Sequence, residues 1–166
     1  MKKIILLFSL ALFVFQSCKK DDIGGTATEK LSGEWFVTAD LLDNSGSVVE
    51  KDVYGIGHFL IGTYNVVSNT TDQIWVDDYD NFWAFKGKVA ADLNTSTFSG
   101  SNIQNASEAG DDITFDITNG LILKGAAKTP SGMAADSISF DVKFSDDTDT
   151  YRITGYRYSG LAGDED

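Results

Sequence analysis

Several short runs of this sequence alternate between apolar and polar residues, and this alternation constrains the fold more than any other feature. Residues 138–145 read Ile-Ser-Phe-Asp-Val-Lys-Phe-Ser, residues 113–117 repeat the pattern, and residues 83–93 place an apolar residue or glycine at every second position. Because neighbouring side chains of a strand point to opposite faces of a sheet, each run has one buried face and one wet face. The alternation therefore predicts an all-β protein built from antiparallel strands.

The number and spacing of the strand-like runs favour a barrel. The predicted strands span 34–42, 53–54, 56–67, 73–76, 82–93, 97–102, 113–118, 121–128, 137–144 and 151–158. Turn signals separate them, and Asn119-Gly120 is the sharpest, because both residues tolerate the positive φ of a type I′ hairpin. About eight to ten strands fit either a sandwich or a barrel. The short connections, and glycines such as Gly62 and Gly87 inside strand-like runs, favour a single antiparallel up-and-down β-barrel of about eight strands over residues 31–166.

Residues 1–17 have the form of a signal peptide. Two lysines follow Met1, and the apolar stretch from Ile4 to Phe15, interrupted only by Ser9, is short for a permanent bilayer span. Cys18 comes directly after a small residue, as the cleavage site of a lipoprotein requires. We expect cleavage to leave Cys18 as the acylated first residue of the mature protein. An ordinary secretory signal with an incidental cysteine is the alternative interpretation.

Composition excludes several classes of function. Residues 18–30 read as the acylated cysteine and a flexible polar tether. Cys18 is the only cysteine, so once it is acylated, disulfides, zinc–thiolate sites and cysteine nucleophiles are not expected. The formal net charge of −12 opposes nucleic-acid binding. With no basic amphipathic stretch, acyl chains on Cys18 are expected to hold the protein to the membrane. No cofactor or metal is expected, and the oligomeric state stays open.

A set of short motifs between about Leu31 and Tyr158 resembles a family of Bacteroidota lipoproteins described as lipid-binding putative hydrolases. The motifs are Gly33-Glu34-Trp35, Gly57-His58-Phe59, Thr63-Tyr64-Asn65, Asn81-Phe82-Trp83, Lys124-Gly125-Ala126, Thr129-Pro130-Ser131-Gly132-Met133, Asp136-Ser137-Ile138, Phe144-Ser145-Asp146 and Gly155-Tyr156-Arg157. The resemblance implies a calycin-like (lipocalin-like) β-barrel with a lipid-sized cavity, and it implies no particular catalytic residues. The charged segment after Cys18 resembles a signal for export to the outer cell surface, and a solvated linker is the alternative.

His58 is the only histidine of the chain and thus the ordinary candidate for a general base near neutral pH. A Ser–His–Asp arrangement would recruit one of many serines, such as Ser131 or Ser137. No Gly-x-Ser-x-Gly motif is present. The structural interpretation, which we favour, places His58 on a strand face with a single buried hydrogen bond.

Carboxylates are abundant but cluster in segments that look like turns. A glycosidase needs two carboxyl groups across a cleft, and Glu34 and Asp40, on a well-patterned strand, are expected to face solvent. Residues 77–81 read Asp-Asp-Tyr-Asp-Asn, which suggests oxygen ligands for calcium. They lack the glycine and the distal glutamate of an EF-hand loop, so a solvated turn is the expectation.

Aromatic residues are the stronger functional signal. The chain has three tryptophans, six tyrosines and eleven phenylalanines. A barrel lined by such side chains offers an apolar pocket with a few polar groups, which is typical of small-ligand sites, although each ring taken alone can simply fill the core. The candidate ligand-binding residues are Trp35, His58, Tyr64, Trp83, Phe85, Phe115, Phe140 and Arg157.

The sequence as a whole predicts an exported lipoprotein, anchored in the bacterial outer membrane, that binds a fatty-acid-like or similar apolar molecule in a barrel cavity. The acyl chain would lie against aromatic walls, with Tyr64, His58 or Arg157 near its polar end. Two alternatives remain at this stage. One is an esterase or lipase-like hydrolase that uses His58, and the other is a glycan-binding or structural surface lipoprotein.

Overall fold

The computed structural model describes residues 25–164. The predicted signal peptide (1–17), Cys18 and the first part of the tether lie outside these residues. The strands are β1 (Gly33–Leu42), β2 (Val48–Glu50), β3 (Phe59–Asn65), β4 (Gln73–Asp77), β5 (Lys86–Asp92), β6 (Thr97–Gln104), β7 (Thr114–Lys128), β8 (Ala134–Phe144) and β9 (Thr150–Arg157). Three short 3₁₀ helices accompany them, namely η2 (Glu29–Leu31), η3 (Val53–Gly55) and η4 (Ala162–Asp164).

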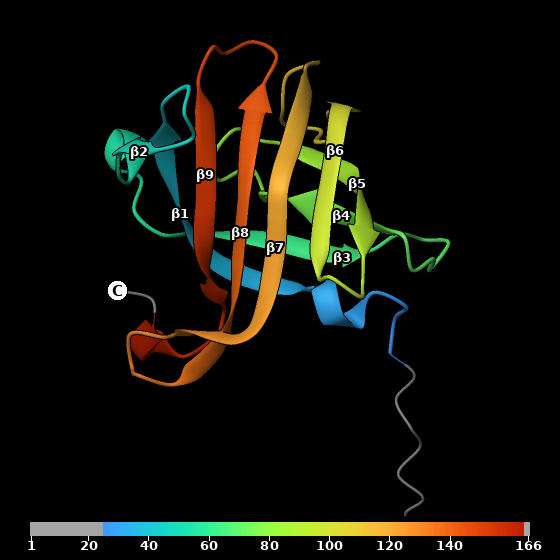
Figure 1. Ribbon diagram of the computed structural model, residues 1–166, viewed down its shortest axis with the longest axis vertical. Coiled ribbons are helices and arrows are strands. Elements are labelled where there is room, and N and C mark those ends of the chain that lie inside the picture. The colour runs from blue at the N-terminus through green and yellow to red at the C-terminus, as the bar shows by residue number, and fades with distance from the viewer. Residues whose placement is uncertain (1–24, 165–166) are drawn as a thin grey trace, which may run out of the picture.

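Eight of the strands close into an antiparallel barrel (Figure 1). Strands β3 to β9 follow one another in sequence order, and β1 pairs with β3 on one side and with β9 on the other. Strand β2 is an addition outside this ring, paired with the last residues of β1. The predicted all-β, up-and-down barrel is confirmed, and its geometry is consistent with a lipocalin-like barrel.

The predicted hairpin at Asn119-Gly120 is wrong. Both residues lie inside the continuous strand β7, where the pairing with β8 shifts register between Thr118 and Leu121. Asn119 does have a positive φ of 55°, as predicted from its residue type. The chain uses that conformation for a β-bulge, which bends a long strand around the barrel and does not reverse it.

Several other boundaries differ from the prediction, and the predicted strand 56–67 is shortened to β3, which leaves His58 before the strand. Val53 and Tyr54 belong to η3 and not to a strand, and residues 82–85 form a loop that precedes β5. Strand β2, which the alternation did not predict, is exposed along all three of its residues. At these positions local hydrophobicity does not predict the secondary structure correctly, because contacts with distant segments decide the conformation.

The barrel interior is filled by side chains from alternating strand positions. The fully buried interior residues include Trp35, Val37, Ile61, Ile74, Val76, Phe85, Phe115, Ile117, Phe140, Val142, Phe144, Tyr151 and Ile153. Each is 2% exposed or less, so side chains fill the interior along these residues. The lipid-sized cavity implied by the family resemblance is therefore not open along these residues. An eight-stranded barrel is just wide enough for its own side chains or one small ligand.

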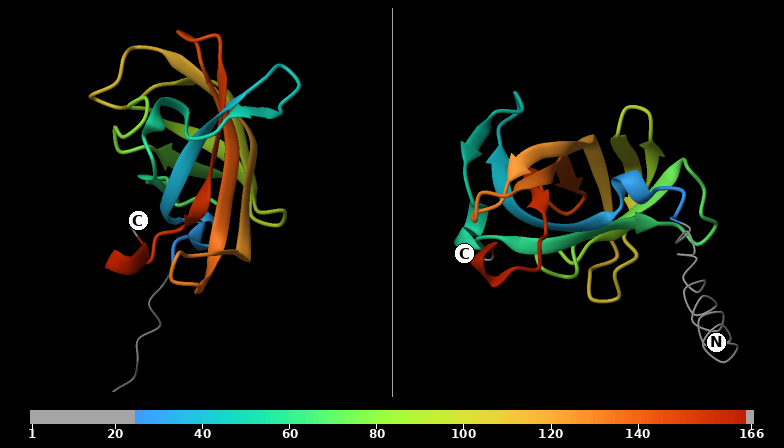
Figure 2. Two further views of the ribbon diagram at one scale, coloured as in Figure 1. Left: turned by 90° about the vertical axis from the view of Figure 1, so that its left-hand side faces the viewer. Right: turned by 90° about the horizontal axis from the view of Figure 1, so that it is seen from below.

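The two ends of the barrel are closed differently. At the end where β1 begins, called here the η2 end, the Trp35 indole donates to Thr63 Oγ1 (2.9 Å) and that hydroxyl donates to the Leu31 carbonyl (2.5 Å). These bonds fix η2 against the barrel, low in Figure 1 and in blue in Figure 2. The opposite end, called the aromatic end, is closed by aromatic rings, as described below.

Replacing Phe140 tests whether the interior behaves as a packed core. Phe140 is fully buried, and its ring lies 5.7 Å from that of Phe98. We expect Phe140→Ala to lower the free energy of unfolding by about 3–5 kcal/mol, because the vacated volume cannot refill. Urea denaturation measures this, with Lys143→Ala, an exposed change on the same strand, expected to stay within about 0.5 kcal/mol. Equal effects of the two changes would contradict a packed interior at Phe140.

Candidate functional site

The aromatic end of the barrel is closed by a loop and not by strands. Residues 78–85 connect β4 to β5, and this loop places two rings over the end of the barrel. Phe82 stacks on Phe59 (5.7 Å between centroids) and meets Tyr151 edge-on (5.2 Å). Trp83 stacks on Phe144 at 4.8 Å, with their planes 7° apart. Phe82 and Trp83, both partly buried, thus complete an aromatic cluster whose other members belong to strands.

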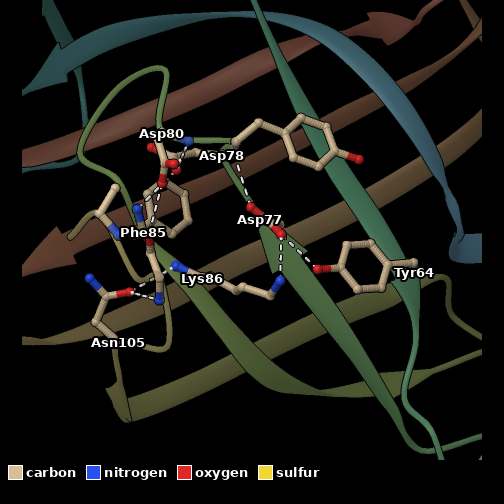
Figure 3. Close-up of polar contacts among 10 residues, drawn as sticks. Tyr64, Asp77, Asp78, Asp80, Phe85, Lys86 and Asn105 are labelled. Carbon is tan, nitrogen blue, oxygen red and sulfur yellow. Dashed lines mark hydrogen bonds and ion pairs between the residues drawn. The ribbon is translucent and has the colours of Figure 1, made fainter.

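A single buried carboxylate holds this loop in shape. Asp78 is 0% exposed, and its side chain accepts hydrogen bonds from the backbone N–H groups of Asp80, Phe82, Trp83 and Phe85 at 2.8–3.1 Å. Figure 3 shows Asp78 enclosed by the loop that it organises. Burial raises the pKa of the Asp78 carboxyl, although the four N–H donors oppose the rise. The expected solvated turn at residues 77–81 is present at Tyr79, Asp80 and Asn81, which are exposed. The expectation is wrong for Asp77 and Asp78, which are buried and hydrogen-bonded.

The loop is also conformationally strained. Tyr79, Asp80 and Ala84 adopt positive φ values of 52°, 62° and 48°. Residues other than glycine rarely occupy this region, and such strain tends to concentrate at sites where a protein binds or moves. Asp78 and the contacts of Phe82 and Trp83 compensate for the strain while the loop stays closed.

A second polar network braces the base of the loop on the outer wall of the barrel (Figure 3). Asp77 accepts a hydrogen bond from the Tyr64 hydroxyl (2.6 Å) and forms an ion pair with Lys86 (3.0 Å). Burial alone would raise the pKa of Asp77, but the bonds from Tyr64, the Tyr79 N–H and Lys86 outweigh it, so the pKa lies below its usual value. The Asn105 side chain accepts from the Lys86 N–H (3.0 Å) and donates to the Ala84 carbonyl (3.0 Å).

The structure divides the predicted ligand-binding residues among separate places. Phe85, Phe115 and Phe140 lie in the filled interior, with Phe85 and Phe115 in edge contact at 5.2 Å. Trp83 lies above them at the aromatic end, where it joins Phe85 through Phe144. These four rings, together with Phe144, form a largely continuous apolar environment.

Trp35 and Arg157 meet at the η2 end. The Arg157 guanidinium lies 4.6 Å from the centre of the Trp35 ring. It donates hydrogen bonds to the Asp136 carboxylate (3.0 Å) and to the Ser32 carbonyl (2.9 Å). A surface hollow of about 680 Å³ adjoins Arg157 and Asp136. Asp136, the Ser32 carbonyl and the Trp35 ring are thus partners of Arg157, which lies at the end of the barrel opposite to Trp83.

His58 and Tyr64 lie outside the barrel interior. Tyr64 belongs to the network around Asp77, whereas His58 precedes β3 and is exposed. The expected buried hydrogen bond of His58 is not found; its ring stacks on Phe36 at 5.0 Å and lies near Tyr156. Within residues 25–164, no serine or acidic side chain hydrogen-bonds to His58, so the described residues do not assemble a Ser–His–Asp arrangement there.

Sequence reasoning missed several residues of the aromatic end. The sequence predicts a strand that begins at Phe82 and a solvated turn that includes Asp78, whereas Phe82 lies in a loop and Asp78 is buried. For Tyr151 the sequence predicts only that it lies in a strand. In the structure its hydroxyl donates to Asp147 and lies 2.8 Å from the Tyr54 hydroxyl. The useful signal was Asp77-Asp78 placed just before Phe82-Trp83, since an aspartate before a turn commonly binds the following N–H groups.

Two further properties concern metals and membranes. Among residues 25–164, histidine, cysteine and carboxylate side chains form no group of three that could hold a metal ion. In the same residues no helix has the length and apolar character needed to cross a membrane.

Removing the Asp78 carboxylate tests its role in holding the loop. Asp78→Ala leaves four backbone N–H groups without their acceptor, so we expect the loop to detach and the free energy of unfolding to fall by about 2–4 kcal/mol. Faster hydrogen exchange at Phe82, Trp83 and Phe85 and stronger acrylamide quenching of Trp83 would report the detachment. Asp72→Ala, at an exposed carboxylate, is the matched control. Unchanged exchange in Asp78→Ala would contradict this role.

Comparison with known proteins agrees with this architecture. No curated protein sequence matches the chain. A family model described as "lipid-binding putative hydrolase" matches residues 20–162, which includes every strand of the barrel. The chain therefore belongs to the family of lipid-binding putative hydrolases.

Proposed function

We propose that this protein binds a lipid-like apolar molecule at the aromatic end of its barrel, in the space that Phe82 and Trp83 occupy in this structure. The observation that carries the proposal is the origin of these two rings. They complete the apolar filling of the barrel, yet they come from a loop and not from a strand. They can leave without breaking any pairing between strands.

The surroundings of the two rings suit an acyl chain. Once they withdraw, the vacated space is bounded by Phe59, Phe144 and Tyr151, with Phe85 beneath them. Burial of apolar surface supplies about 25 cal/mol per Å², and a ligand that takes over these ring contacts recovers what the loop gives up. Membership of a lipid-binding family supports the same ligand class.

The strained loop supports binding by exchange. Positive φ values at Tyr79, Asp80 and Ala84 raise the free energy of the closed form, so opening the loop relieves strain as the ligand enters. The observed form is then the ligand-free member of a two-state equilibrium, and the ligand shifts the population towards the open form.

Dodecanoate binding to the mature chain carrying Cys18→Ser tests the proposal. We expect one-to-one binding in native mass spectrometry and calorimetry. In the double variant Phe82→Ala/Trp83→Ala the ligand no longer displaces two rings, so we expect its affinity to rise about tenfold, equivalent to about 1.4 kcal/mol. The variant should also be less stable than the parent chain in urea.

Phe36→Ala is the matched control, because Phe36 is a buried ring on the outer wall, stacked on His58. It should lose stability without a gain in affinity. Failure of the parent chain to bind any acyl compound would refute the proposal. An affinity unchanged by the double variant would show that the ligand lies elsewhere.

We also propose that Cys18 anchors the protein by acyl chains to the bacterial outer membrane. The leader and cysteine support this reading. The first described residues lie at the η2 end, so such an anchor would leave the aromatic end directed away from the membrane (Figure 1).

Metabolic labelling with a palmitate analogue checks the anchor. The parent chain expressed in a lipoprotein-processing bacterium should incorporate the label and remain with membranes. Cys18→Ser should abolish both, whereas Ser17→Ala, which keeps a small residue before the cysteine, should retain both. Labelling that persists in Cys18→Ser would exclude Cys18 as the acylated residue.

A further inference from the structure

The outer wall of the barrel carries a row of side chains across three strands that the proposed function does not use. Tyr64 on β3 is paired with Trp75 on β4, and Trp75 is paired with Lys88 on β5. The ammonium groups of Lys86 and Lys88 lie 5.6 and 5.0 Å from the centre of the Trp75 ring. Two cations therefore flank one partly exposed indole in a chain whose formal net charge is −12.

The two lysines differ in their partners. Lys86 is neutralised by Asp77, which lies 3.0 Å away. Within residues 25–164, no carboxylate forms an ion pair with Lys88, and its ammonium group lies over the Trp75 ring. Lys88 is exposed and thus available to an anionic ligand at little cost in broken contacts.

The wall beside Lys88 is interrupted. Strands β5 and β6 pair only from Ala90 to Asp92 with Thr97 to Ser99. The register of β6 against β7 shifts twice, between Phe98 and Gly100 and between Gly100 and Ile103. The chain after β6 meets β5 again where the Ala106 N–H donates to the Lys86 carbonyl (2.8 Å), so the interruption is bounded at both ends. A groove of about 420 Å³ lies over this interruption, lined by Trp75, Lys88, Gly100, Ser101, Ile103, Gln104 and Ala106. In Figure 1 the three strands β4, β5 and β6 lie together on the right-hand side of the barrel.

Ile103 belongs both to the groove and to the packing of the interior. Ile103 lines the groove and also packs against the buried core. Gly87 on β5 and Gly100 on β6 leave room for it, since a Cβ at either position would collide with the Ile103 side chain. A Cβ at Gly87 would also collide with the Phe115 ring, which places that interior ring directly behind the interruption.

We propose that this groove holds the anionic head group of the lipid-like ligand, with Lys88 as its charge partner and Ile103 as the side chain that the acyl chain passes. This inference rests on the proposed function. To reach the space vacated by Trp83, the chain would have to pass Phe115, Phe85 and Phe144. These rings are in successive contact and buried in this structure, so they would have to shift as the chain enters. Ser101 and Gln104 add polar groups at the rim, and the Trp75 indole supports the first methylenes.

Because Lys88 is a cation, we expect the head group to be an anion, either a carboxylate or a phosphate monoester on a saturated chain. Three probes of equal chain length separate the possibilities: dodecanoate, dodecyl phosphate and the neutral dodecanol. Calorimetry on the mature chain with Cys18→Ser should show tighter binding of at least one anion than of dodecanol. The tighter of the two anions names the head group.

Lys88→Gln is the decisive variant, because it keeps the stem of the side chain and removes the charge. We expect it to weaken binding of the preferred anion about tenfold and to change dodecanol affinity less than twofold. Lys128→Gln, at an exposed lysine on the β7–β8 hairpin, should leave all three affinities unchanged. Ile103→Ala should increase the association rate of every probe several-fold in stopped-flow fluorescence.

The outcomes distinguish this inference from the proposed function. If none of the probes binds the parent chain, the proposed function fails and this inference fails with it. If the probes bind but Lys88→Gln weakens the anions and dodecanol equally, or affects none of them, the groove does not hold the head group, and binding at the aromatic end stands alone. An association rate that is unchanged in Ile103→Ala would place the entry route elsewhere.

Discussion

The structure depends on the pairing of β1 with two partners. The first half of β1 pairs with β3 and most of its length pairs with β9, so one strand joins the beginning of the domain to its end. This closure removes the unpaired edges of the sheet and creates an inside that must be filled. Rings and branched side chains fill it, and the Trp35 indole, bonded to Thr63, closes the η2 end. Everything else about the site follows from the way the other end is closed.

At the aromatic end the barrel is closed by a loop under strain. The Asp78 carboxylate satisfies four backbone N–H groups of that loop, which a short segment with positive φ values could not satisfy within itself. A loop held by one buried carboxylate is a more local and more reversible closure than a strand. The proposed exchange of Phe82 and Trp83 for a ligand would reconcile a barrel whose interior is filled by side chains with membership of a lipid-binding family.

The outer wall and the interior are connected at the β5–β6 interruption. The β5–β6 ladder is interrupted where β6 bulges, before the Ala106 N–H bonds to the Lys86 carbonyl. The absence of side chains at Gly87 and Gly100 leaves room for Ile103 in this interval. Asp77 links this region to the loop, because it holds Lys86 on the wall and directly precedes Asp78. The wall, the loop and the interior rings thus form one contiguous region.

The alternation of apolar and polar residues by itself determined the all-β class, the antiparallel arrangement and most of the inward-facing residues, because side-chain direction in a strand is a local property. The tertiary structure alone decided the rest. Asn119-Gly120 became a bulge and not a hairpin because β7 continues along β8. Asp78 became buried, and Phe82 and Trp83 left the strand pattern to close the barrel, because partners distant in sequence surround them. Trp35 was separated from Trp83, and Lys88 was joined to Trp75, by strand order and register, which depend on contacts between residues far apart in the chain.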